Sequence, residues 1–391
     1  MSLPETEILT SLVSRVFRVD SVTLGDSKKF IVCYRGHLHN EDSVAAYDQL
    51  DEYVASYNLM PLFRMEKGEQ VIYLVTRLPE PPPTNYRTPL ILFILTVFSV
   101  MLAGAQPEGV VPAGIGAQIL FLLKNIFTGW PFELSLLSIL LAHEFGHYLM
   151  SRYHKTPATL PYFIPFPFSP LGTMGAAILM RGIPKNKRVL FDIGVAGPLA
   201  GLVVAIPVLF IGLSMSTTTT LLASPNGFLE GNSLFYLFAK YLSFGQWLPA
   251  PAGPHGILYW LQFFFTGSPI PFGGQDVLIS NVAFAGWAGL LVTALNLIPA
   301  GTLDGGHVIY ALFGEKASKA FPYIFGLLAI LGLFWTGWWI WAVLLLWLGR
   351  VHAEPLDQIT PLDTSRRMLA VLVIILFILT FSPVPFMSLA K

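Results

Sequence analysis

The pattern of hydrophobic and polar positions divides the chain into two parts. Residues 1–80 are polar and mixed in charge. They contain helix-like stretches near 4–14 and 41–57, and short β-rich runs near 17–23, 28–34, 59–64 and 70–76. This order, α-β-β-α-β-β, predicts a small soluble α+β domain over residues 1–80. The proline run that follows, Glu80-Pro81-Pro82-Pro83-Thr84, favours a stiff extended backbone, so we assign 81–87 to a linker.

Long apolar segments dominate the remainder, residues 88–391. They occur near 88–108, 131–150, 188–213, 279–298, 321–350 and 368–388. About 20 apolar residues are needed to cross a bilayer as a helix, so each is a candidate span. The fifth is interrupted at Thr336-Gly337, which favours a pair of short helices, and the weaker stretch 113–128, with Lys124 inside it, favours an interfacial position. The pattern therefore predicts an α-helical polytopic membrane protein of about seven spans.

Composition supports a membrane protein and excludes several other classes. The chain is 54% hydrophobic and 12% charged, about half the charged fraction of a typical soluble protein. Its formal net charge is zero, which predicts no nucleic-acid partner. Cys33 is the single cysteine, which excludes an internal disulfide framework and a cysteine-ligated zinc. The first residues lack a basic region followed by an apolar core, so we expect no cleaved signal peptide.

The distribution of basic residues predicts the orientation. Nine Lys or Arg precede the first span and six lie from Arg152 to Arg188, whereas Lys124 and Lys240 stand alone in the stretches between. Cytoplasmic loops carry the excess of basic residues. The N-terminal domain and the connections 151–187 and 299–320 are therefore predicted to be cytoplasmic.

The second span contains a candidate metal site, His143-Glu144-Phe145-Gly146-His147. Histidines four apart share one face of a helix, so both imidazoles can reach one zinc ion. The glutamate after the first histidine can take a proton from water that the metal activates. An ordinary helix is the simpler interpretation of such a pentapeptide in a soluble chain. Ionisable groups within a membrane span are expensive and usually functional, so we favour the metal site here.

A third ligand follows the fourth span. A catalytic zinc has three protein ligands and one open position. Asp304 lies just after the span, and the glycines that follow it, Gly305 and Gly306, let backbone approach closely. In the predicted topology both motifs reach the cytoplasmic side of the membrane, which favours Asp304 as the third ligand.

Together these motifs resemble the site-2 protease family of intramembrane zinc metalloproteases. The resemblance is carried by residues 143–147, by 191–201 (Phe-Asp-Ile-Gly-Val-Ala-Gly-Pro-Leu-Ala-Gly), and by 285–299 running into Leu303-Asp304-Gly305-Gly306. The last stretch is most similar to the cyanobacterial and plastid branch, of the ethylene-dependent gravitropism-deficient and yellow-green type. The resemblance covers roughly residues 135–355 and leaves the role of the N-terminal domain open.

The resemblance implies an intramembrane zinc endopeptidase that hydrolyses peptide bonds in transmembrane segments of other proteins. One Zn²⁺ per chain would be bound by His143, His147 and Asp304, with Glu144 as general base. Asn296 matches a family asparagine near the reacting carbonyl, where its amide could stabilise the oxyanion. A hydrogen bond between helices is the alternative role for Asn296.

Residues 156–182 combine five prolines with aromatic side chains, and 171–178 are predicted to be extended. Irregular backbone at membrane depth is tolerated only where protein or a water-filled cavity covers it. We therefore interpret the stretch as a re-entrant β element beside the active site; a surface loop is the alternative. Gly172, Thr173 and Gly175, with Asn296, are candidate substrate-binding residues, because a free strand edge can pair with an unwound substrate.

Two other functions stay open at this point. A catalytically silent relative could act as a membrane-protein chaperone, although every expected ligand is present. A transporter also carries ionisable residues in its spans, although this chain shows no repeated pair of broken helices. The expected partners are transmembrane substrates and the lipid bilayer. A bacterial cytoplasmic membrane is the expected location and a plastid membrane the alternative, with the N-terminus cytoplasmic. The sequence does not indicate an oligomeric state.

Overall fold

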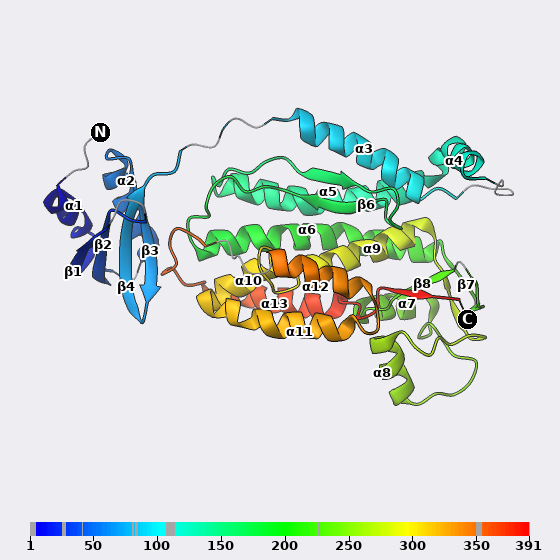
Figure 1. Cartoon of the computed structure of the whole chain (residues 1–391). Helices are drawn as coiled ribbons and strands as arrows, with labels where there is room; N and C mark the ends of the chain where they lie inside the picture. Colours follow the sequence, from blue (N-terminus) through cyan, green and yellow to red (C-terminus); the bar gives the residue numbers. More distant parts are fainter. Residues whose placement is uncertain are drawn as a thin grey trace.

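The computed structural model describes residues 5–25, 29–40, 42–79, 82, 85–106, 114–225, 227–348 and 354–390. Its N-terminal unit lies at one end of the molecule (Figure 1). This unit contains α1 (Thr6–Val13), β1 (Phe17–Leu24), β2 (Val32–Leu38), α2 (Ser43–Ala55), β3 (Leu59–Glu66) and β4 (Glu69–Thr76). The elements follow the predicted order. The predicted proline linker, apart from Pro82 and residues 85–87, lies outside the described residues, and the division at residues 80 and 87 stays a prediction.

The four strands form one antiparallel sheet in the order β1-β2-β4-β3. Alternate strand residues such as Tyr34, Phe63 and Ile72 are buried against side chains of α1 and α2, including Leu9 and Leu50. This alternation is the expected pattern for a sheet with one face covered by helices. The same core includes Leu356 and Ile359, which come from a distant part of the chain.

A short extended segment, residues 356–358, joins the N-terminal unit to the helical part. On one side the Phe63 amide donates to the Leu356 carbonyl and the Gln358 amide donates to the Phe63 carbonyl, each at 3.0 Å. On the other side the Asp357 amide donates to the Lys185 carbonyl at 2.8 Å. Segment 356–358 therefore lies between the edge strand β3 and residues 184–186, which lead directly into α6.

The helical part matches most of the predicted apolar segments. Its helices are α3 (Arg87–Ala103), α4 (Ile115–Lys124), α5 (Trp130–Tyr153), α6 (Lys187–Ser214), α7 (Leu234–Phe244), α8 (Ile257–Thr266), α9 (Asn281–Asn296), α10 (Asp304–Phe313), α11 (Phe321–Leu331), α12 (Gly337–Leu348) and α13 (Thr364–Thr380), with 3₁₀ turns at Ile126–Gly129 and Gly314–Ala320. The fifth apolar segment is the predicted pair of short helices, α11 and α12. The helices α7, α8 and α10 were not among the predicted segments.

Two helical segments are long and apolar enough to cross a membrane by length and composition, Ile126–Tyr153 and Lys187–Ser214. Other apolar helices within the described residues are shorter, among them Arg87–Ala103 and Asn281–Asn296. At 1.5 Å per residue, a 17-residue helix such as α3 is about 25 Å long. The structure is therefore mostly helical with a few small sheets, and the count of seven spans stays a prediction.

The centre of the molecule is built from α5, α6 and α9, which run along its length (Figure 1). Small residues let these helices approach closely. A Cβ on Gly146 of α5 would lie 2.5 Å from the Ala196 carbonyl oxygen of α6, and one on Gly286 of α9 would lie 2.5 Å from Leu209 Cα. Close contact through glycine is typical of helices that associate in a membrane.

A β-hairpin lies beside this centre. It consists of β5 (Tyr162–Pro165) and β6 (Thr173–Ala177), which pair antiparallel with Tyr162 opposite Ala177. The ring of Phe163 on β5 contacts Phe93 on α3, with centroids 5.1 Å apart. The stretch predicted to be extended thus forms a strand. Two further small sheets pair β7 (Thr217–Thr220) with β9 (Gln275–Leu278) and β8 (Phe228–Glu230) with β10 (Phe386–Ser388).

Candidate metal centre

Two histidines and one aspartate meet between α5 and α10. His143 and His147 lie one helical turn apart on α5, and both are buried. Their Nε2 atoms are 3.2 Å apart. Asp304, the first residue of α10, places its Oδ2 atom 3.2 Å from His147 Nε2 and 3.3 Å from His143 Nε2. The structure therefore brings together the three residues that the sequence selects as ligands.

These separations fit a tetrahedral metal. The three donor atoms form a nearly equilateral triangle with sides of 3.2, 3.2 and 3.3 Å. A tetrahedron with such edges has its centre about 2.0 Å from each vertex, the usual distance of zinc from histidine nitrogen and carboxylate oxygen. Two neutral imidazoles and one carboxylate also form a common ligand set for catalytic zinc. In donor type and in spacing, the three side chains suit zinc.

Backbone of α6 orients His147. Its Nδ1 atom lies 2.7 Å from the carbonyl oxygen of Ile193. A carbonyl can only accept, so Nδ1 carries the proton and Nε2 keeps its lone pair toward Asp304 and His143. A hydrogen bond of this kind fixes both the tautomer and the plane of a metal-binding imidazole.

Glycines of α6 make room for the two imidazoles. A Cβ on Gly197 would lie 2.0 Å from His147 Nε2, so no larger residue fits opposite that ring. A Cβ on Gly201 would lie 3.3 Å from His143 Nδ1, a tight contact but far less severe than that at Gly197. Glycine is needed after Asp304 as well, because a Cβ on Gly305 would lie 2.0 Å from the Leu297 carbonyl oxygen. Close approach by α6 and by the end of α9 therefore depends on these glycines.

Glu144 opens onto the same cavity as the three donor residues. This cavity has a volume of about 490 Å³ and is lined by the donor residues, by Glu144 and Asn296, by His307, and by residues 176–180 at the end of β6 and just beyond it. Glu144 is only 4% exposed, and its carboxylate interacts with the backbone of Ile178. An acid next to the donor atoms and against an extended segment can exchange a proton with a group held there.

Asn296 reaches the cavity from the last turn of α9. Its Nδ2 atom lies 3.2 Å from His143 Nε2. The amide is thus in contact with a donor residue, and its role toward a reacting carbonyl stays a prediction.

The predicted substrate-binding residues lie farther along the hairpin. The carbonyl of Gly172 accepts a hydrogen bond from Ser99 Oγ of α3 at 2.6 Å. Thr173 Oγ1 donates to the Ile164 carbonyl at 2.8 Å and accepts from the Gly175 amide at 3.0 Å. These three residues hold the hairpin together and do not line the metal-side cavity. Residues 176–180 line it instead.

Some contributors to this site were not recognised from the sequence. Gly197 faces the imidazole of His147, and nothing in the sequence indicates that contact. The Ile193 carbonyl carries no signal in the side-chain pattern. The glycine spacing in residues 191–201 is the one sequence feature that indicates close contact with another helix, although it does not say which side chain is contacted.

Comparison with known proteins identifies relatives of this chain. Residues 131–333 match peptidase family M50. The chain is 29% identical over 328 residues to a protein of Oryza sativa subsp. japonica named "probable zinc metalloprotease EGY1, chloroplastic". This match covers 78% of this chain and 52% of the relative. The Arabidopsis thaliana protein of the same name is also 29% identical, over 332 residues, covering 78% of this chain and 55% of the relative.

A longer match is to the Arabidopsis thaliana "probable zinc metalloprotease EGY2, chloroplastic", which is 25% identical over 402 residues, covering 99% of this chain and 66% of the relative. The chain thus spans about half the length of the first two relatives. No solved structure matches it.

Proposed function

Since this chain belongs to peptidase family M50, we propose that it is an intramembrane zinc endopeptidase that hydrolyses peptide bonds in transmembrane segments of other proteins. One observation carries the proposal. His143, His147 and Asp304 converge at zinc-compatible spacing in a cavity that also contains Glu144. The names of the relatives agree with zinc-dependent proteolysis.

Each residue has a distinct task in this proposal. His143, His147 and Asp304 would hold one zinc ion per chain, with Ile193 orienting His147. When bound, zinc supplies a Lewis acid that makes water a better nucleophile and polarises a carbonyl. Glu144 accepts a proton and passes it to the departing amine. Asn296 donates its amide hydrogen to the oxygen on which negative charge develops.

The extended residues 176–180 are the proposed contact surface for the substrate. Hydrolysis needs an extended backbone, because a helix hides its carbonyl groups in internal hydrogen bonds. A transmembrane substrate must unwind locally, and its freed backbone groups need partners that lipid lacks. Residues 176–178 lie next to Glu144 and can pair with an unwound segment by strand addition. The predicted contribution of Gly172, Thr173 and Gly175 is then indirect, through the shape of the hairpin.

The membrane placement is part of the same proposal. The distribution of basic residues supports an N-terminal α+β domain and a metal centre near the cytoplasmic side. A bacterial cytoplasmic membrane and a plastid membrane are both compatible with this placement. The chloroplast proteins among the relatives support the cyanobacterial and plastid branch of the family, but they do not identify the organism. The division into 1–80, 81–87 and 88–391 is retained as a hypothesis.

The rival functions receive less support. A catalytically silent chaperone would have no need for a complete donor set with an acid beside it. A transporter would need ionisable groups distributed along a path, whereas the motif residues here converge on one cavity.

The test compares two substitutions on α5 in otherwise intact protein. Glu144→Gln should keep stoichiometric zinc, measured by elemental analysis, and should slow cleavage of a model transmembrane substrate about 10²–10⁴-fold, the usual contribution of a general base. Glu133→Gln is the matched control, because Glu133 lies in the first turn of the same helix, away from the cavity. It should cleave at the wild-type rate.

The substrate itself supplies a second comparison. Glycine and proline lower the cost of unwinding a helix by roughly 1 and 3 kcal/mol, so a substrate with either near the cytoplasmic third of its span should be cut faster than a poly-leucine version. Wild-type cleavage by Glu144→Gln protein would contradict the assignment of the base. Equal cleavage of both substrates would contradict unwinding as the limiting requirement.

A further inference from the structure

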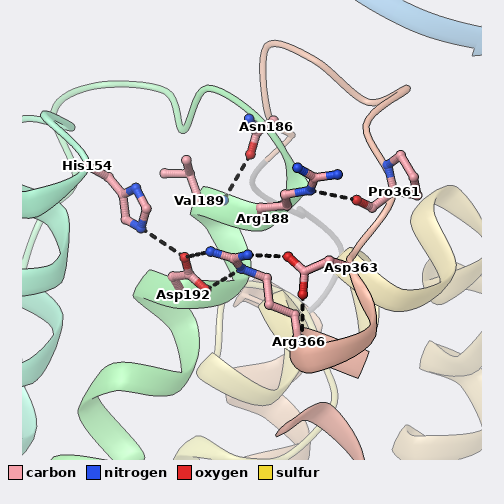
Figure 2. A network of polar contacts seen from close by, with 8 residues as sticks. All are labelled: His154, Asn186, Arg188, Val189, Asp192, Pro361, Asp363 and Arg366. Atoms are coloured by element: carbon pink, nitrogen blue, oxygen red, sulfur yellow. Dashed lines mark hydrogen bonds and ion pairs between the residues drawn. The ribbon is translucent and has the colours of Figure 1, made fainter. Parts of the chain in front are cut away.

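An acidic residue ties three helices together next to the metal centre. Asp192 lies in the second turn of α6, between the end of α5 and the beginning of α13 (Figure 2). Its Oδ2 accepts a hydrogen bond at 2.9 Å from Nε2 of His154, the C-cap residue that directly follows α5. Arg366 of α13 donates to both carboxylate oxygens, from Nε at 2.7 Å and from Nη2 at 2.6 Å. The three helix ends therefore meet at one carboxylate.

This arrangement is well fixed. A bidentate arginine–carboxylate pair defines both the distance and the relative orientation of its two partners. The side chains of Asp192 and His154 are each only 15% exposed, so water competes weakly for these bonds. Arg366 is held from its other side by Asp363, which caps α13 by accepting from the Arg366 amide at 2.9 Å (Figure 2).

The next residue along α6 contacts the metal centre. Ile193 follows Asp192, and its carbonyl oxygen accepts the Nδ1 hydrogen of His147 at 2.7 Å. The position of this turn of α6 relative to α5 thus sets the direction of the imidazole. Asp192 fixes that position twice, once to α5 itself through His154 and once to α13 through Arg366.

We propose that Asp192 is a positioning residue of the metal centre: by tying this turn of α6 to α5 and α13, it holds the Ile193 carbonyl where it orients His147 for the metal. The inference rests on the proposed function, since it assumes that the donor triad binds zinc. A partly buried charge network is costly to build compared with apolar packing. Packing of the helices alone would not require such a network. Asp192 lies one residue before the Ile193 carbonyl that orients His147, and this position explains why the network is present.

The experiment uses the full-length protein and measures its metal binding directly. Zinc affinity is determined by competition with a chromophoric chelator, and the visible spectrum of the cobalt(II)-substituted protein reports the donor geometry. Asp192→Asn removes the charge at nearly constant volume. It should weaken zinc binding about 10–100-fold, as loss of outer partners of zinc ligands does, and should alter the cobalt spectrum. Asp192→Glu, which can still pair with Arg366, should recover part of the loss.

Asp363→Ala is the control variant. It removes a partner of the same arginine and the cap of α13 while leaving the bonds of α6 in place. It should lower the melting temperature yet leave zinc affinity within about twofold, well below the loss expected at Asp192. The inference is wrong if Asp192→Asn binds zinc with wild-type affinity and spectrum, if Asp192→Glu binds no better than Asp192→Asn, or if Asp363→Ala weakens zinc as much. Absence of zinc from wild-type protein would overturn the proposed function along with it.

Discussion

Replacing Gly197 by alanine should remove His147 from the metal centre. The added methyl carbon would lie 2.0 Å from His147 Nε2, 2.3 Å from Cδ2 and 2.5 Å from Cε1. Non-bonded heavy atoms sit at about 3.5 Å or more, so the ring must move by roughly 1.5 Å. A zinc–nitrogen bond tolerates about 0.2 Å. The donor atom therefore leaves the position from which it can reach the metal.

The surroundings do not let the ring move without loss. A displaced ring gives up the hydrogen bond to the Ile193 carbonyl. Overpacking of this kind costs about 1–3 kcal/mol. Because two protein ligands hold zinc far less well than three, zinc content should fall well below one per chain, and cleavage should fall with it.

Gly201→Ala provides the matched control, on the same helix and one turn later. Its Cβ would come no closer than 3.3 Å to His143, at Cβ and Nδ1 and not at the Nε2 donor atom. A shift of about 0.2 Å restores an ordinary contact, and the zinc–nitrogen bond tolerates that much. Alanine also favours a helix by about 0.8–1.0 kcal/mol over glycine. This variant should keep its zinc and melt at or slightly above the wild-type temperature. Zinc is measured by elemental analysis and stability by thermal denaturation in detergent. Stoichiometric zinc in Gly197→Ala protein would refute the reasoning.

Two other predictions concern the donor set and a buried acid elsewhere. Asp304→Ala should lower zinc occupancy and cleavage together, and full zinc content with persisting activity would exclude Asp304 as the third ligand. Glu230 lies between the predicted spans 188–213 and 279–298, and its burial, followed by the nearby charge of Asp276, raises its pKa to about 7 from 4.5. A raised carboxyl pKa stabilises the fold below pH 4.5, and that contribution is lost as pH rises through 7. As pH rises from 5 to 8, the melting temperature of the wild type should therefore fall relative to that of Glu230→Gln. If the melting temperatures of the two proteins change in parallel with pH, Glu230 does not titrate in this way.

The sequence predicts local features of this protein better than distant ones. The apolar segments locate α3, α5, α6 and α9 to within a few residues, because a long run of apolar residues by itself indicates where such a helix lies. The short helix α10 lies in a stretch of mixed polarity, for which the sequence predicts only a connection. Its beginning is fixed by glycines that pack against the end of α9, and this is a tertiary contact without periodicity.

The donor residues were identifiable for a similar reason. His143 and His147 belong to one turn of one helix, and Asp304 is an ionisable residue at the end of an apolar segment. The Ile193 carbonyl and Asp192 were not identified, since one is backbone and the other depends on Arg366, 174 positions away. Gly172, Thr173 and Gly175 lie outside the lining of the metal-side cavity, and their role in substrate binding stays a prediction. The position of the hairpin depends on contacts with α3, such as that between Ser99 and Gly172, which the sequence does not reveal.

The insertion of segment 356–358 beside β3 has a consequence for biosynthesis. Arg64 binds the carbonyl of Pro355, a partner 291 positions later in the chain. At roughly 5–20 residues per second, translation needs about 15–60 s to supply that partner. Throughout that interval the β3 edge is open, and an open strand edge is a template for pairing with other chains. The N-terminal unit should therefore mature only after nearly the whole protein has been made. A chain that stalls on the ribosome before residue 355 would leave that edge exposed to chaperones and proteases.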